Sequence, residues 1–422
     1  MLSTNMLRPP SFETSACGEP AHSEPLPEVL IIGEFPFPTG AAGANYLRGH
    51  CRSICEAGFT VGLLPNQSTG RQEDAQPDGT YRFQGLPYWP LCRSRPGSRF
   101  ERYLKLFTAK PDARLDWLAR KNLAGVKVII VYPGVWGTVA LLLCLRRLCR
   151  LHKIRLLVHV VEWQAPNYRG GLAYLMRDLD AEAQRRWLNP HLDGVICVSE
   201  YLKNYYDSHG VRAALIPPLL DLTEPVWRSS AAAVTPPHRP VRLLFSGRYS
   251  RDRQDNLLKA VKAMRECGGE IVLEYLGASK ENIADLTGVG VELVNSLGDG
   301  VRFHGKVPDQ QVHGIVASAT FGVLLREDAP WSKACFPSKV PEFSALGVPM
   351  LCNLTSDLAH YLKHGENAVI VQDTTVDAVC AALRQVLSLT SEQMLGMRQA
   401  SRETATRFDG CRHAVEYRNL LT

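Results

Sequence analysis

The stretch 336–350, FPSKVPEFSALGVPM, is the part of this chain with the clearest local signals. An apolar run at 321–325 comes before it and predicts a buried strand. Ser338 is of a residue type that caps helices, and Pro341 is tolerated in a first helical turn, where backbone N–H groups lack partners. Gly347 favours a helix end. The pattern therefore predicts a strand, a loop, a short helix and then a second strand.

Lys339 and Glu342 fall in the first turn of this predicted helix. The N-terminal end of a helix favours anions, and the ammonium group of Lys339 strengthens that preference. The carboxylate of Glu342 has two uses at such a place, either as a partner of the helix dipole or as an acceptor for the hydroxyl groups of a ligand. The stretch therefore predicts an anion site with a carboxylate beside it.

Length and composition favour a globular protein of two domains. The chain has 422 residues, which is long for a single core. Hydrophobic residues make up 45% and charged residues 21%, as is usual for soluble proteins. The net charge of +6 does not suggest nucleic acid, but it suits an acidic small ligand or an anionic membrane surface. The 12 cysteines are scattered without zinc-site spacing, which favours reduced thiols in a cytosolic protein.

Residues 1–26 are rich in Ser, Pro, Glu and Ala, and they lack the basic start and apolar core of a signal peptide. We expect a disordered leader there. The longest apolar run, at 139–145, is too short to span a bilayer. Any membrane contact would therefore be peripheral.

The first ordered part of the chain predicts a strand at 28–33, a loop with Gly40 and Gly43, a helix at 44–57 and a strand at 59–64. The loop lacks the G-x-G-x-x-G pattern of a dinucleotide-binding turn. Two interpretations of its glycines stay open. They permit a tight turn, or they let a ligand approach the backbone.

His159 and Glu162 lie at the end of a predicted strand at 154–161. In open α/β sheets, ligands bind beyond the C-terminal ends of the strands. His159 is therefore either a hydrogen-bonded core residue or part of a site. Glu162 is a base, an acceptor for hydroxyl groups or a solvated loop residue.

Two charged helices have simpler interpretations. The predicted helix at 137–151 carries three arginines, which a solvated face explains better than membrane binding does. Asp178 and Asp180 form the only Asp-x-Asp of the chain, but they fall inside a predicted helix, where residues two apart do not share a face. We therefore expect a solvated helix surface there rather than a metal site.

Residues 219–240 contain few large apolar residues and predict a linker between two domains, at 27–218 and 241–400. After a predicted strand at the start of the second domain, three arginines, among them Arg248 and Arg253, fall in a turn before the next helix. Guanidinium groups match phosphate oxygens, which favours an anion site over a solvated basic loop.

Strands and helices alternate in both halves of the chain. The pattern predicts an α/β protein with two doubly wound domains that face each other across a cleft. The stretch 391–421 is helical without a strand partner. We expect its last part, 401–422, to pack back toward the N-terminal domain.

Four segments in this order resemble the motifs of retaining glycosyltransferases of the GT-B fold, specifically the large family numbered four. They are FPFPTGAAG at 35–43, DGVICVSEYL at 193–202, FSGRYSRDR at 245–253 and the stretch 336–350, with VRFHGKV at 301–307 as a further match. The resemblance covers residues 28–420. It implies two Rossmann-like domains, with the acceptor on the first and a nucleotide diphosphate sugar on the second, and no cofactor besides this donor.

The resemblance also implies roles for single residues. Arg248 takes the place of the family's pyrophosphate-binding arginine, and Arg253 that of the next basic residue, which is usually a lysine. Glu342 matches the second of the family's two glutamates, which binds the ribose hydroxyls. Ser338 and Lys339 lie on the side of the donor phosphates, and the loop with the two glycines joins the donor-binding set.

His159 is similar to the family's first-domain histidine near the donor sugar. One position departs from the family pattern. Much of the family has an acid eight positions before the second glutamate, where this chain has Ala334. The contact with the donor sugar would then come from main-chain groups of 333–337 or from Glu327.

The implied activity is transfer of a sugar from a nucleotide diphosphate sugar to a hydroxyl acceptor, with retention at the anomeric carbon. Arg248, Arg253, Lys339 and the helix start at Ser338 would stabilise the leaving diphosphate without a metal ion. His159, Glu162, Arg248 and Arg253 would form the catalytic set. Lipid-linked saccharides are common acceptors in the family, so polysaccharide or glycolipid biosynthesis at the cytoplasmic face of the inner membrane is expected. Ala334 leaves a second hypothesis open, a non-catalytic subunit that binds nucleotide sugars. An epimerase or a phosphorylase lacks a supporting motif.

Overall fold

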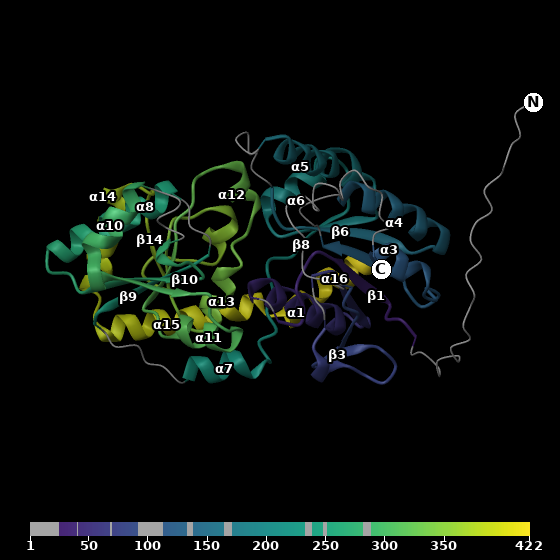
Figure 1. Cartoon of the computed structure of the whole chain (residues 1–422), viewed down its shortest axis with the longest axis horizontal. Helices are drawn as coiled ribbons and strands as arrows, with labels where there is room; N and C mark the ends of the chain where they lie inside the picture. The colour runs from purple at the N-terminus through teal and green to yellow at the C-terminus, as the bar shows by residue number, and fades with distance from the viewer. Residues whose placement is uncertain are drawn as a thin grey trace, which may run out of the picture.

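The chain folds into two α/β halves, each built on its own sheet, as the computed structural model in Figure 1 shows. The structure describes residues 25–39, 41–67, 70–91, 113–132, 138–163, 171–232, 239–247, 251–281 and 288–422. Both sheets are mainly parallel, and helices separate most of the strands along the chain. The predicted α/β class is therefore confirmed.

The first sheet has eight strands in the order β3-β4-β2-β1-β5-β6-β7-β8. Its pairs are parallel except for the hairpin of β3 and β4. Parallel strands covered on both faces consist of apolar runs, and all five residues of β1 are buried. The strands are β1 (Val29–Gly33), β2 (Val61–Pro65), β3 (Tyr81–Phe83), β4 (Leu86–Tyr88), β5 (Val128–Tyr132), β6 (Arg155–Val160), β7 (Gly194–Cys197) and β8 (Ala213–Leu215).

Helices cover both faces of this sheet (Figure 1). They are α1 (Ala41–Glu56), α3 (Ala113–Ala119), α4 (Thr138–His152), α5 (Gly171–Ala183), which continues as a π-helical turn (Gln184–Leu188), and α6 (Glu200–Asp207). Leu47, Cys51 and Ile54 of α1 are buried, as their spacing predicts. Cys55, on the next position of the same helix, is exposed.

The second sheet has six parallel strands in the order β11-β10-β9-β12-β13-β14. The strands are β9 (Val241–Ser246), β10 (Ile271–Leu276), β11 (Val301–Gly305), β12 (Phe321–Leu324), β13 (Met350–Cys352) and β14 (Ala368–Ile370). Its helices are α8 (Arg251–Glu266), α10 (Gly288–Leu297), α11 (Asp309–Ala317), α12 (Pro330–Ala334), α13 (Lys339–Ala345), α14 (Val376–Ser388) and α15 (Ser391–Ala405). A last helix, α16 (Ala414–Leu421), lies against the first half. The stretch 336–350 thus contains α13 and leads into β13.

The connection between the two sheets is more structured than the predicted linker. It contains α7 (Pro225–Ala232), whose Trp227 is only 3% exposed. The Trp227 ring meets the ring of His313 on α11 edge to face, with 4.9 Å between the ring centroids. A buried aromatic side chain holds this helix in place. The segment has few other large apolar residues, which is why the sequence pattern predicted a linker there and not a helix.

Helix α1 is the place where the chain crosses between the halves. The backbone of 219–220 passes so close that a Cβ at Gly49 would lie 2.3 Å from the carbonyl carbon of Leu219. Leu220 is in turn hydrogen-bonded to the segment after α15. Its N–H donates to the carbonyl oxygen of Phe408 at 2.8 Å, and its carbonyl oxygen accepts from the N–H of Gly410 at 2.9 Å. The helical stretch predicted at 391–421 is therefore interrupted, and α16 packs on α1 and β8.

A buried cluster of histidine and tyrosine side chains joins β6, α1 and α16. Nε2 of His159 and the hydroxyl of Tyr46 are 2.6 Å apart, and Nδ1 of His50 is 2.6 Å from the hydroxyl of Tyr417. Burial lowers the pKa of His159 to about 3, so its ring is neutral. Burial, and then the nearby His159, hold the pKa of His50 well below its usual value.

The solvated surface predicted at Asp178 and Asp180 is wrong for Asp180. This half-buried carboxylate accepts hydrogen bonds of 3.3 Å from the backbone N–H groups of Thr138 and Val139, at the start of α4. A carboxylate there satisfies N–H groups that have no partner within the helix. Asp178 pairs with Arg177 instead.

Gly322 of β12 sets how closely α13 packs on the second sheet. A Cβ at this position would lie 2.3 Å from Cδ1 of Phe343. We expect Gly322→Ala to lower the free energy of unfolding by about 1–3 kcal/mol, because buried Phe343 must move to make room. Urea titration checks this, with Gly396→Ala in α15 as the control, since a Cβ there meets no atom within 4 Å. Equal stability of the two variants would contradict this view of the packing.

The buried ring of His159 predicts a pH-dependent stability. Its folded pKa of about 3 lies below the usual 6.5, so between these values the unfolded chain binds a proton that the folded chain does not. Stability should therefore fall as the pH is lowered through this window. In His159→Gln, we expect the loss of unfolding free energy between pH 6.5 and 4.5 to be smaller by about 2 kcal/mol. Exposed His152, replaced by Gln, is the control; an unchanged pH dependence in His159→Gln would refute the assignment.

Candidate functional site

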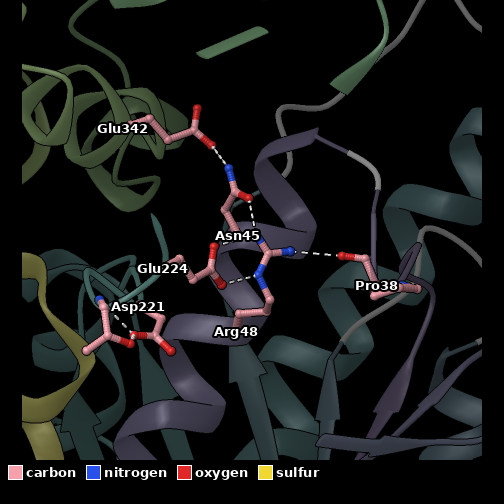
Figure 2. Close-up of polar contacts among 7 residues, drawn as sticks. Pro38, Asn45, Arg48, Asp221, Glu224 and Glu342 are labelled. Carbon is pink, nitrogen blue, oxygen red and sulfur yellow. Dashed lines mark hydrogen bonds and ion pairs between the residues drawn. The ribbon is translucent and has the colours of Figure 1, made fainter. Parts of the chain in front are cut away.

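Glu342, in the first turn of α13, is held from two sides. Nζ of Lys339 donates to one carboxylate oxygen at 2.9 Å. Nδ2 of Asn45 on α1 donates to the other at 2.9 Å, as Figure 2 shows. Glu342 itself is only 8% exposed. A carboxylate of the second half is thus fixed by a side chain of the first half.

Asn45 belongs to a chain of hydrogen bonds that continues to Arg48 (Figure 2). Oδ1 of Asn45 accepts from Nη2 of Arg48 at 2.6 Å. Nε and Nη2 of Arg48 bind the carboxylate of Glu224, and Nη1 donates to the carbonyl oxygen of Pro38 at 2.8 Å. Arg48 and Glu224 are both buried, so this ion pair lies away from water.

A cavity of about 300 Å³ lies beside this chain, between the two halves. Its lining combines apolar side chains, among them Val312 and Leu346, with the charged groups of Arg48, Lys339 and Glu342. Mostly apolar pockets with a few convergent polar groups are typical of sites for small molecules. This cavity is therefore the candidate site.

The glycine-containing loop differs from its prediction. Helix α1 begins at Ala41, so Gly43 stands in the first helical turn and does not form a tight turn. A Cβ at Gly43 would meet no atom within 4 Å, so the space beside it is open. Gly40 lies outside the described residues.

The two predicted arginines are not placed by the structure. Arg248 lies outside the described residues, and Arg253 stands in the first turn of α8 with a side chain that also falls outside the described part. Ser338 occupies the N-cap position of α13, but its hydroxyl makes no capping hydrogen bond. The reason is its helical backbone, with φ −58° and ψ −15°, because a capping side chain works from an extended backbone.

Ala334 lies at the contact between the halves. It is fully buried, and its carbonyl oxygen accepts a hydrogen bond of 2.7 Å from Oγ of Ser199, the residue that caps α6. An acid at this position would place its carboxylate in a contact without water, which is costly unless partners are present. The backbone, not a side chain, therefore makes the polar contact here.

Arg326 is a residue of this region that the sequence interpretation missed. It follows β12, is 8% exposed and donates from Nη1 to the carbonyl oxygen of Cys335 at 2.7 Å. Its guanidinium carbon lies 5.2 Å from the centre of the Trp331 ring. Its position just after a buried strand could have marked Arg326 as a candidate site residue, because ligands bind beyond the C-terminal ends of such strands. Asn45, Arg48 and Glu224 were also missed, and no local pattern marks them.

Glu162 and Glu327 are exposed, just beyond β6 and β12. Burial, and then the negative charge of Glu162, raise the pKa of Tyr132 to about 12. Burial raises the pKa of the Cys335 thiol, and Glu162 adds to that effect while Arg326 opposes it. The charge of Glu162 is therefore felt by Tyr132 and Cys335, while His159 is hydrogen-bonded to Tyr46, the neighbour of Asn45.

The described part of the chain offers neither a metal cluster nor a membrane-spanning helix. Within these ranges, no group of three or more His, Cys, Asp and Glu side chains is arranged to hold a metal ion. No helix among the same residues has the length and apolarity needed to cross a bilayer.

One comparison with known proteins finds a similarity in the second half. Residues 240–389 match the family model described as Glycosyl transferases group 1. A search of the curated proteins finds no match.

Solved structures match both halves together. The catalytic domain of starch synthase IV from Arabidopsis thaliana, bound to ADP and acarbose, has a TM-score of 0.64 at 14% identity, over 94% of this chain and 98% of that one. Sucrose-phosphate synthase from Thermosynechococcus elongatus has a TM-score of 0.63 at 17% identity, over 90% and 94%. HepE of Anabaena in complex with UDP has a TM-score of 0.59 at 12% identity, over 92% and 97%.

At these identities the likeness shows the fold alone, which is the GT-B fold of glycosyltransferases. The chain therefore has the GT-B fold, and its residues 240–389 are similar to the group 1 glycosyl transferase family.

Proposed function

We propose that this protein transfers a sugar from a nucleotide diphosphate sugar to a hydroxyl acceptor, with retention at the anomeric carbon. The observation that carries the proposal is the buried carboxylate of Glu342, which Lys339 and Asn45 hold beside the cavity between the halves. The group 1 domain supports the same reaction class. Neighbours of the same fold that hold UDP or ADP support a nucleotide donor.

In this proposal Glu342 accepts hydrogen bonds from the ribose hydroxyls of the donor. Lys339, with Ser338 beside it, faces the diphosphate, and Arg248 and Arg253 add positive charge by resemblance. Negative charge grows on the diphosphate as its bond to the sugar breaks, and fixed cations in a sheltered site lower that barrier. Cationic side chains thus take the role that a divalent ion has in other transferases.

The reaction we propose proceeds on one face of the sugar. The bond between the anomeric carbon and the phosphate oxygen breaks, the acceptor oxygen bonds to the same carbon, and the leaving diphosphate takes the acceptor's proton. His159 and Glu162 then act as positioning groups. His159 is neutral and buried, so it acts by fixing Tyr46 on α1.

Contacts with the donor sugar need a source other than Ala334. Its side chain is apolar and buried, and its carbonyl already bonds Ser199. We propose that exposed Glu327, or main-chain groups of 333–337, meet the sugar hydroxyls. The open space beside Gly43, and by resemblance Gly40, gives the donor room to approach the start of α1.

The same departure at Ala334 favours a second candidate function, a subunit that binds nucleotide sugars without turning them over. A thermal-shift screen with UDP-, ADP- and GDP-sugars identifies the donor through the stabilisation that binding gives. Hydrolysis or transfer of the donor that binds would support the enzyme. Tight binding without any turnover over a panel of saccharide and lipid-linked acceptors would support the binding subunit.

Glu342→Gln tests the donor site. The variant keeps the shape of the side chain but loses the charge that strengthens hydrogen bonds from hydroxyl groups, so donor binding should weaken about 10- to 100-fold. Isothermal calorimetry with the donor from the screen measures this. The control is Glu366→Gln, because Lys363 and Glu366 form an exposed pair with the same spacing as Lys339 and Glu342. Unchanged affinity in Glu342→Gln would reject the assignment.

We further propose a lipid-linked acceptor in polysaccharide or glycolipid biosynthesis, with peripheral contact at the cytoplasmic face of the inner membrane. The support is the outer surface of α4 and α5, which pack together. Leu151 on α4, Leu179 on α5 and Trp187 just after it are 80%, 60% and 74% exposed. Arg147 and Arg150 on α4 are exposed with them, a combination that suits an anionic bilayer surface.

This surface predicts that the protein sediments with vesicles of phosphatidylglycerol and phosphatidylcholine more than with phosphatidylcholine alone. Removing two charges in Arg147→Gln/Arg150→Gln should weaken binding several-fold at low salt, since each basic residue contributes about 1 kcal/mol near such a surface. Leu395→Ser, an exposed leucine on α15 in the other half, serves as the control. Equal sedimentation with both kinds of vesicle would exclude the charge-dependent contact.

A further inference from the structure

We propose that Asn45 is a positioning residue for the nucleotide donor, acting from the first half on the ribose-binding carboxylate of the second. The inference rests on the proposed function, because that function assigns the ribose to Glu342. It adds a residue that no motif marks and a reason why donor affinity depends on both halves of the molecule.

The orientation of the Asn45 amide follows from its neighbours. Arg48 has only donors, so the group that faces it at 2.6 Å is the amide oxygen. The NH₂ group then points to Glu342, whose carboxylate accepts at 2.9 Å (Figure 2). A flipped amide would set two donors against each other at Arg48 and two acceptors against each other at Glu342. Asn45 is therefore fixed as a hydrogen-bond donor to Glu342.

The carboxylate keeps capacity for a ligand. Its two oxygens offer about four lone-pair sites. Asn45 uses one site on the first oxygen, and Lys339 uses one on the second. Within the described part of the chain one site on each oxygen remains, which matches the two neighbouring hydroxyl groups of a ribose. Asn45 thus fixes the direction of the carboxylate without competing with the diol.

The position of Asn45 is itself fixed by the first half. Arg48 holds its oxygen, while Glu224 and the carbonyl of Pro38 hold Arg48. The bond between Asn45 and Glu342 joins the two halves, so it forms only when α1 and α13 lie side by side. The carboxylate is therefore set for ribose only while the halves lie as they do here.

The cavity beside Glu342 is the place where the ligand would bind. Asn45, Arg48, Lys339 and Glu342 line the same space of about 300 Å³. A diol meets an oriented carboxylate there, and a phosphate meets the ammonium group of Lys339. The chemistry fits a nucleoside diphosphate, with Asn45 acting through Glu342 rather than on the ligand.

Two variants of Asn45 separate this role from a structural one. Asn45→Ala removes the bonds to Glu342 and Arg48. Asn45→Asp keeps an acceptor for Arg48 but sets a second carboxylate against Glu342. UDP, ADP and GDP serve as probes in calorimetry, and we follow the one that binds the unmodified protein best. We expect binding about 5- to 20-fold weaker in Asn45→Ala and weaker still in Asn45→Asp, with thermal unfolding still cooperative.

A double-mutant cycle with Glu342→Gln gives the decisive readout. If Asn45 acts through Glu342, adding Asn45→Ala to Glu342→Gln should weaken binding by less than about twofold. In hydrolysis of the corresponding donor sugar, Asn45→Ala should raise KM and change kcat little. Asn204→Ala and Asn204→Asp, at an exposed position of α6, are the controls.

The outcomes separate the two proposals. If no probe binds, or if Glu342→Gln leaves binding unchanged, the proposed function fails and this inference with it. If Glu342→Gln weakens binding while both Asn45 variants match the controls, only the role of Asn45 is overturned. Losses that add fully in the double variant also overturn it, because Asn45 would then act independently of Glu342.

Discussion

The buried guanidinium of Arg48 is the constraint on which the candidate site depends. A charge removed from water needs fixed partners, and breaking such a pair costs several kcal/mol. The partners of Arg48 come from the loop after β1, from α1 itself and from the segment before α7. Through Asn45 the same chain reaches Glu342. Arg48 thus contacts the chain at Pro38 and Glu224 directly, and at Glu342 through Asn45.

Helix α1 contacts three different parts of the molecule. Gly49 admits the backbone that leaves the first sheet, and the segment before α16 packs on the same crossing. Tyr46 and His50 bond the buried His159 and the Tyr417 of α16. Successive turns of one helix therefore contact the second half, the core of the first sheet and the end of the chain. The orientation of the Glu342 carboxylate depends on this helix through its bond to Asn45.

Much of the fold follows from local signals, because parallel strands buried on both faces consist of apolar runs. The strand before the stretch 336–350, the turn at Gly347 and the strand after it agree with the sequence to within about two residues. Two of the misses share one cause. Asp180 caps a neighbouring helix and Trp227 packs against His313 of α11, and neither partner is adjacent in sequence.

The sequence by itself determined the α/β class, the order of the elements and the candidacy of Lys339 and Glu342, since these rest on periodicity, helix signals and a motif. Only the tertiary structure decided that Asn45 and Arg48 belong to the same site, that Ala334 meets Ser199 through its backbone, and that His159 is a neutral core residue. The physical reason is that a hydrogen bond depends on distance in space. Partners separated by about 300 residues, as Asn45 and Glu342 are, leave no periodic trace in a single sequence.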